Sequence, residues 1–153
     1  MKSLELKVPP LIIACLCALA MFGISRFFEK QRFLAGLGDV IGFVFVVTGI
    51  LVAVAGIVAF RKARTTVNPL RNGNISALVT SGIYSMTRNP MYVGILLLLT
   101  GFGLLLSSLY SLVMCVVFVL YIDRFQIQPE EKMLEAIFKN DYVLYKARVR
   151  RWV

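Results

Sequence analysis

The sequence predicts an all-α integral membrane protein: a helical bundle with about four transmembrane helices, the last two as a tight hairpin, and a cytoplasmic amphipathic C-terminal helix. Composition is the first support, since 59% of the 153 residues are hydrophobic and the mean hydropathy is +0.80. The second is that no charge occurs in the 21 residues between Asp39 and Arg61 or in the 34 between Arg88 and Asp123. A helix needs roughly 20 apolar residues to cross a bilayer, so both stretches qualify.

The expected spans follow the stretches without charges, and only the last of them ends in charged residues, Asp123 and Arg124. The first, residues 8–25, has prolines only at its start, where a helix tolerates them, and the second covers residues 40–60. The longest stretch would form a helix on the order of 50 Å long, too long for a hydrocarbon core near 30 Å. It is therefore expected to fold back as a tight hairpin of two helices, residues 90–106 and 109–126.

The N-terminal segment has a second interpretation. Lys2 and Lys7 precede an apolar stretch that ends in Ala18-Leu19-Ala20, a pattern that also occurs in cleaved signal peptides. The four-span prediction keeps this segment as a helix.

The remaining segments are polar and are predicted to lie on one side of the membrane. Residues 61–89 form a cytoplasmic loop, and apolar side chains recur every three or four positions in residues 129–149, which predicts an amphipathic helix. All but three of the 17 basic residues would share this side. The positive-inside rule then places both termini in the cytoplasm. We expect the chain to be a multi-pass protein of a bacterial inner membrane. Residues 1–153 are expected to form a single domain.

Composition also argues against several classes of function. The chain has no histidine, and its three cysteines lie inside apolar segments, where they act as small hydrophobic residues. No zinc or haem site is therefore expected. The net charge of +9 follows from topology and attraction to anionic lipids, so a nucleic-acid partner is not required. RNA binding by the basic C-terminal segment remains the alternative.

Adjacent carboxylates mark one candidate site. Glu130 and Glu131 begin the predicted C-terminal helix, where the helix dipole already favours negative charge. Arg124 lies only six residues before Glu130, at the end of a span. An arginine that holds an anion beside a glutamate that holds a cation or hydroxyl groups indicates a zwitterionic or bipartite ligand.

A second polar cluster stands at the mouth of the third span. Tyr84, Asn89, Pro90 and Tyr92 occur in "TSGIYSMTRNPMY". Each has a structural alternative, as a helix cap, a first-turn proline or an interfacial aromatic. Together they join a polar loop to an apolar helix, which suits a site for an aqueous cofactor and an apolar substrate.

The pattern "LVTSGIYSMTRNPMYVG", then a long apolar hairpin, "EE" and "DYVLYKARVRRW", resembles the isoprenylcysteine carboxyl methyltransferase family. The wider group includes the phospholipid methyltransferases. The resemblance covers about residues 65–152. It implies a cytoplasmic pocket for S-adenosyl-L-methionine, joined to a tunnel for a lipophilic or prenylated substrate from the membrane. Many eukaryotic members have histidine where Asn89 stands here.

The resemblance also implies roles for individual residues. The cofactor would be bound by Ser76, Leu78, Val79, Tyr84, Asn89, Pro90, Tyr92 and Glu130. Arg124 lies near a family arginine assigned to the substrate carboxylate, although the spacing also allows Gln126. Apart from the resemblance, the chemistry of an amine acceptor makes Glu131 the second catalytic candidate, as a base. No metal is implied.

The chemistry of the acceptor separates the alternatives. Methyl transfer to a carboxylate needs no general base, because a carboxylate is ionised at neutral pH. A phospholipid amine would first have to lose a proton, with help from Glu131, Glu130 or Tyr84. We therefore expect a carboxylate acceptor of the isoprenylcysteine type, with phospholipid amine N-methylation as the alternative. A small transporter or a membrane scaffold would be the non-enzymatic alternatives.

Overall fold

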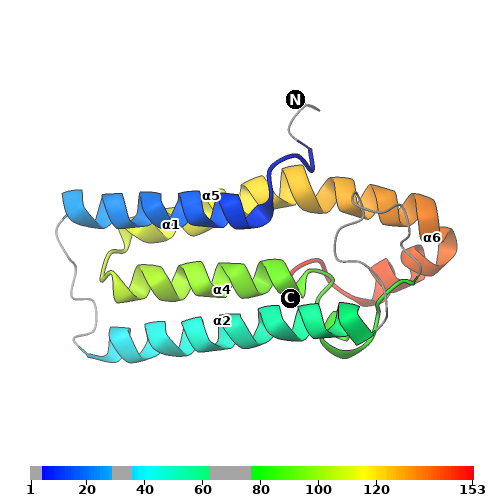
Figure 1. Ribbon diagram of the computed structural model, residues 1–153, viewed down its shortest axis with the longest axis horizontal. Helices are drawn as coiled ribbons and strands as arrows, with labels where there is room; N and C mark the ends of the chain where they lie inside the picture. Colours follow the sequence, from blue (N-terminus) through cyan, green and yellow to red (C-terminus); the bar gives the residue numbers. More distant parts are fainter. Residues whose placement is uncertain (1–4, 29–35, 63–76) are drawn as a thin grey trace.

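A computed structural model describes residues 5–28, 36–62 and 77–153. Within these ranges the chain is helical, without strands, and its long helices run roughly parallel to one axis (Figure 1). The helices are α1 (Pro10–Phe27), α2 (Leu37–Lys62), α4 (Pro90–Leu105), α5 (Val113–Ile122) and α6 (Gln128–Arg148). Short turns of other helix types are η2 (Gly82–Ser85), η3 (Tyr110–Leu112) and the π-helical η4 (Asp123–Ile127). The predicted all-α membrane bundle is confirmed.

Among the residues that the structure describes, three helical stretches are long and apolar enough to cross a membrane. They are Pro10–Phe27, Leu37–Lys62 and the continuous stretch Tyr110–Arg148, and α4 is a shorter apolar helix of 16 residues. Large apolar side chains on α2 point away from the bundle: Phe43 is 64% exposed and Leu51 63% exposed. Such exposed apolar surface is expected where helices face lipid.

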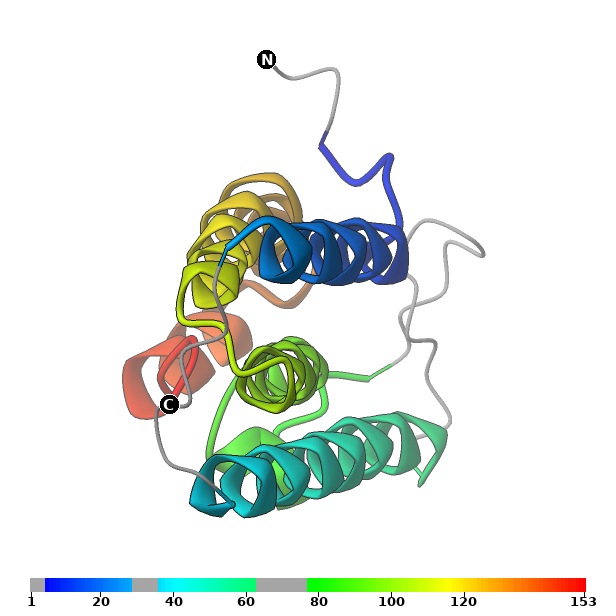
Figure 2. The same ribbon diagram turned by 90° about the vertical axis from the view of Figure 1, so that its left-hand side faces the viewer.

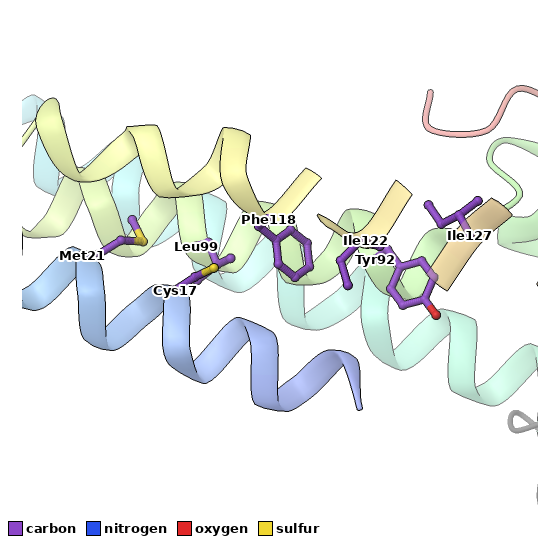
Figure 3. Packing of buried hydrophobic residues seen from close by; sticks show 7 residues of the cluster. All are labelled: Cys17, Met21, Tyr92, Leu99, Phe118, Ile122 and Ile127. Atoms are coloured by element: carbon purple, nitrogen blue, oxygen red, sulfur yellow. The ribbon is translucent and has the colours of Figure 1, made fainter. Parts of the chain in front are cut away.

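The helix α4 is the central helix of the bundle and contacts the helices on both of its sides. Viewed along the bundle, α4 lies between α2 on one side and the α1–α5 pair on the other (Figure 2). The core cluster fills the space between α1, α4 and α5, and Figure 3 shows its members: Cys17, Met21, Tyr92, Leu99, Phe118, Ile122 and Ile127. Phe118, Met21 and Ile122 are completely buried.

Glycines bring α2 and α4 unusually close together. Gly42, Gly49 and Gly56 are buried at seven-residue intervals on α2. Gly42 lies opposite Gly101 on α4 and Gly49 lies opposite Gly94, whereas Gly56 faces the start of α4. A Cβ atom on Gly49 would lie 2.7 Å from the carbonyl oxygen of Gly94, and one on Gly101 would lie 2.6 Å from that of Gly42. Small residues allow this close backbone contact, which supplies much of the attraction between helices in lipid.

The hairpin between α4 and α5 turns at residues 106–109. Ser107 has a positive φ of 51° in this turn, and the buried Ser111 hydroxyl that follows donates to the Met21 carbonyl at 2.9 Å. The turn is thereby tied to α1.

The chain continues from α5 into α6 without a break, through the π-helical turn η4. The sequence had instead predicted a span that ends at residue 126 and a separate helix that starts at 129. Pro129 has no N–H for the Phe125 carbonyl four residues earlier, and the backbone N–H of Leu6 donates to that carbonyl at 3.0 Å. The proline is therefore accommodated inside a continuous helix. α6 then kinks at Lys139, where φ is 46° and ψ is −119°.

Candidate functional site

The polar segments of the chain meet at one end of the bundle. The end of α2, the turn η2, the start of α4 and the helix α6 all lie at this end (Figure 1). Gly82 begins η2 with a φ of +63°, a conformation that glycine adopts without strain. The turn directs Tyr84 inward, and the Tyr145 hydroxyl donates to the Tyr84 carbonyl at 2.7 Å. Burial, reinforced by Tyr145 and Glu130, raises the pKa of Tyr84 above its ordinary value.

A tyrosine–glutamate pair forms the centre of the candidate site. Tyr92 lies in the first turn of α4, where Pro90 starts the helix, and its hydroxyl donates to Glu130 Oε1 at 2.7 Å. Burial raises the pKa of Glu130 to about 7; the Tyr92 hydrogen bond opposes this shift, while the neighbouring charge of Glu131 adds to it. Glu130 is therefore a carboxyl group that titrates near neutral pH.

The adjacent Glu131 is held in an ion-pair network. Its Oε1 lies 3.2 Å from Arg88 Nη1, and Arg151 binds both of its oxygens, with Nε to Oε1 at 3.0 Å and Nη2 to Oε2 at 2.6 Å. Arg151 Nη1 also donates to Asp123 at 3.0 Å. This bidentate pairing occupies the Glu131 carboxylate, whose role as a base stays a prediction.

Asn89 and its neighbours bind the backbone of the C-terminal segment. Asn89 Nδ2 donates to the Arg151 carbonyl at 2.9 Å, and the Thr87 hydroxyl donates to the same oxygen at 3.3 Å. The Arg88 N–H donates to the Arg150 carbonyl at 3.0 Å. Arg151 was not among the predicted site residues; its signal was the basic run "RVRRW" within a segment that the resemblance already covered.

Arg124 and Gln126 face a different partner, the segment of residues 5–8. Arg124 Nη1 pairs with Glu5 Oε1 at 3.1 Å, and its side chain remains 42% exposed. The buried Gln126 donates from Nε2 to the Val8 carbonyl at 2.6 Å. Both side chains tie the N-terminal segment to η4, and a substrate-binding role for either remains a prediction.

The predicted cofactor-lining stretch lies just before η2. Ser76 is outside the described residues, and residues 77–80 have no regular secondary structure. Val79 is buried and Leu78 is partly buried.

An open hollow of about 520 Å³ lies between α2 and η2. Its walls are mainly aliphatic, with one cation; the lining residues are Ala55, Val58, Ala59, Lys62, Ser81, Gly82 and Ile83. Neither member of the Tyr92–Glu130 pair lines it. Among the residues that the structure describes, no three His, Cys, Asp or Glu side chains are grouped to hold a metal ion.

Comparison with known proteins assigns the chain to a family. The family model described as "Phospholipid methyltransferase" matches residues 37–141, which include α2, η2, α4, α5 and Glu130. The chain belongs to the phospholipid methyltransferase family. This confirms the family resemblance inferred from the motifs.

Two curated relatives match parts of this family member. One is an uncharacterized protein of Haemophilus influenzae, 40% identical over 63 residues, which are 41% of this chain and the whole of that protein. The other is the Saccharomyces cerevisiae protein-S-isoprenylcysteine O-methyltransferase, 37% identical over 75 residues, which are 47% of this chain and 30% of the yeast protein. No solved structure matches. Family membership and the apolar helices together place the chain among the membrane methyltransferases.

Proposed function

We propose that this phospholipid methyltransferase family member transfers a methyl group from S-adenosyl-L-methionine to a lipophilic acceptor, most readily a carboxylate of the isoprenylcysteine type. The Tyr92–Glu130 pair carries the proposal. It sits where a polar, arginine-rich end of the bundle meets the apolar start of α4. An aqueous cation and an apolar acceptor can meet only at such a boundary.

The chemistry of the site fits this cofactor. The bound cofactor would supply an electrophilic methyl group on a positively charged sulfur, together with an ammonium group, hydroxyls and a carboxylate. Glu130 offers carboxylate oxygens to the cationic groups or hydroxyls. Arg88 is 91% buried in its side chain, and its Nε has no hydrogen-bond partner among the described residues. Such an unsatisfied buried donor favours a nearby anionic group.

The environment of the pair favours transfer to an anion. Methyl transfer from a positively charged sulfur to an anion cancels two opposite charges. Its rate therefore rises when water is excluded and when donor and acceptor are aligned. Burial of Tyr84 and Tyr92 beside Glu130 supplies a region of low polarity. A carboxylate acceptor needs no proton removed, which suits a site where Arg88 and Arg151 occupy Glu131.

One observation supports phospholipid amine N-methylation as the second candidate. A carboxyl group with a pKa of about 7 is suited to remove a proton from an amine near neutral pH, and Glu130 would then act as the base. Transfer of labelled methyl groups to N-acetyl-prenylcysteine, compared with phosphatidylethanolamine vesicles, distinguishes the two acceptors.

We further propose that the polar end of the bundle faces the cytoplasm. Of the basic residues that the structure describes, only Arg26, in the last turn of α1, lies at the opposite end. The positive-inside rule then directs the other end, with the candidate site, to the cytoplasm.

Calorimetric titration of the detergent-purified protein tests the cofactor. We expect saturable binding of S-adenosylmethionine and S-adenosylhomocysteine, and none of ATP, which shares only the adenosine part. A folded, monodisperse sample that binds neither sulfur compound would contradict the proposal and favour a transporter or scaffold.

Cofactor affinity should depend on pH through Glu130. Its pKa of about 7 means that the carboxyl is mostly protonated at pH 6 and mostly ionised at pH 8, and only the ionised form attracts a cation. Affinity for S-adenosylmethionine should therefore be about tenfold weaker at pH 6 than at pH 8. The Glu130→Gln variant should lose this difference, whereas an equal slope in both proteins would assign the titration to another group.

A further inference from the structure

The last residues of the chain form a strap that is bound to the segment leading into α4. This C-terminal strap, residues 149–153, leaves α6 in an extended conformation at Val149. Its Arg150 and Arg151 carbonyls accept hydrogen bonds from residues 87–89, and the Trp152 side chain packs against the core cluster. The strap thus connects α6 to the segment that leads into α4.

Arg151 makes the densest set of contacts in the strap. Its Nε and Nη2 donate to the two carboxylate oxygens of Glu131, at 3.0 and 2.6 Å, and its Nη1 donates to Asp123 Oδ1 at 3.0 Å. Asp123 lies in the π-helical turn η4, and Glu131 lies in the first turn of α6. One guanidinium therefore spans the junction at which α6 departs from α5.

This junction decides where Glu130 points. Neighbouring residues on a helix are about 100° apart around its axis, so a side chain that is held at Glu131 also sets the direction of Glu130. A π-helical turn interrupts the regular hydrogen-bond ladder, which makes the rotation of the following helix sensitive to added contacts. With Glu131 held by Arg88 and Arg151, Glu130 meets the Tyr92 hydroxyl at 2.7 Å.

We propose that Arg151 is a positioning residue of the methyltransferase site, which acts through Glu131 and Asp123 to hold Glu130 opposite Tyr92. The hydrogen bonds and ion pairs that the structure describes for the Arg151 side chain go to Glu131 and Asp123, and none goes to Tyr92 or Glu130. This role rests on the proposed function, because Glu130 is the group that would bind the cofactor. Docking of the strap and binding of the cofactor are then coupled, and each strengthens the other.

The charges around Glu130 agree with this role. Glu130 faces Tyr92 from α4, Tyr84 from η2 and Glu131 from its own helix. Of these neighbours Glu131 carries the negative charge that makes ionisation of Glu130 harder, and Arg151 and Arg88 offset that charge. Without Arg151, Glu130 would ionise only at higher pH.

The test compares Arg151→Gln and Arg151→Lys with a control, Arg148→Gln. Arg148 is also basic and close in sequence, but its described contact is a 3.4 Å hydrogen bond to the Leu144 carbonyl within α6. Two readouts are needed: calorimetric affinity for S-adenosylhomocysteine and the fluorescence of Trp152. Because Trp152 is the chain's single tryptophan, its emission reports docking of the strap directly.

Arg151→Gln should bind S-adenosylhomocysteine about tenfold more weakly at pH 7, and its Trp152 emission should be red-shifted. The pH at which its affinity falls by half should shift upward. Arg151→Lys retains the charge without the bidentate fork, so it should bind at least threefold more weakly than the original protein. Arg148→Gln should match the original protein in both readouts. S-adenosylhomocysteine should also shift Trp152 emission to the blue in the original protein.

Unchanged affinity in Arg151→Gln, or in Arg151→Lys, would overturn the positioning role while leaving the proposed function standing. If Arg151→Gln does not fold, the lysine variant decides alone. If the original protein binds no S-adenosyl compound, the proposed function itself fails. Trp152 fluorescence would then still show whether Arg151 holds the strap.

Discussion

Replacement of Glu130 by glutamine is expected to weaken binding of S-adenosylmethionine about 10- to 100-fold. Glutamine keeps the shape of the side chain but removes the negative charge, and a hydrogen bond to a charged group contributes about 1.5–3 kcal/mol. Folding should be unaffected or favoured, because burial already disfavours the ionised form of Glu130. Calorimetric titration and thermal unfolding in the same detergent measure both effects.

Two further variants make this test specific. Tyr92→Phe removes the hydroxyl that stabilises ionised Glu130, so it should also weaken binding, by a smaller factor. Glu135→Gln is the matched control, since Glu135 lies on the same helix and pairs only loosely with Lys146, at 3.6 Å. Loss of folding together with binding in both Glu130→Gln and Tyr92→Phe would show that the pair is structural rather than functional.

Addition of a side chain at Gly94 should produce a large loss of stability. A Cβ atom there would lie 2.8 Å from both the Ala53 nitrogen and the Gly49 carbonyl oxygen, which are backbone atoms that cannot rotate away. Gly94→Ala should therefore lower the free energy of unfolding by about 1–3 kcal/mol, the usual cost of overpacking, and Gly94→Val should lower it further. Denaturation in mixed detergent micelles provides the measurement.

Gly23→Ala is the control for this prediction. Gly23 is also inside an apolar helix, but a Cβ atom added there would have no neighbouring atom within 4 Å among the described residues. Alanine there should leave stability unchanged or raise it by up to about 1 kcal/mol, the difference in helix propensity. Equal effects at the two positions would contradict the close approach of α2 and α4.

The Gly94 variant should also weaken cofactor binding. Gly94 lies two residues after Tyr92 on α4, so a separation of α4 from α2 moves the hydroxyl that meets Glu130. A loss of stability without any loss of affinity would show that the site tolerates this displacement.

The class of fold was predictable because it depends on simple periodic properties. Charge-free stretches of 21 and 34 residues cannot be exposed to water over their length, so they predict spanning helices without any knowledge of their neighbours. The family was also recognisable, because each of its motifs is a contiguous stretch of residues and the motifs follow one another in a fixed order. Membership over residues 37–141 confirms that resemblance.

The packing of the helices against one another was harder to predict from the sequence. The seven-residue spacing of Gly42, Gly49 and Gly56 is visible in the sequence, and it could have predicted a close helix contact. Its partner surface, Gly94 and Gly101 on α4, depends on which helices become neighbours. That choice is made by packing across the whole bundle.

By itself, the sequence determined that this is a helical membrane protein of the phospholipid methyltransferase family, with its polar chemistry gathered at one end. Only the tertiary structure decided the different surroundings of two identical neighbours, Glu130 and Glu131. One is enclosed against Tyr92 and titrates near pH 7, whereas the other is neutralised by Arg88 and Arg151. The physical reason is that burial and charge pairing arise from residues distant in the chain, and adjacent positions on a helix face different neighbours.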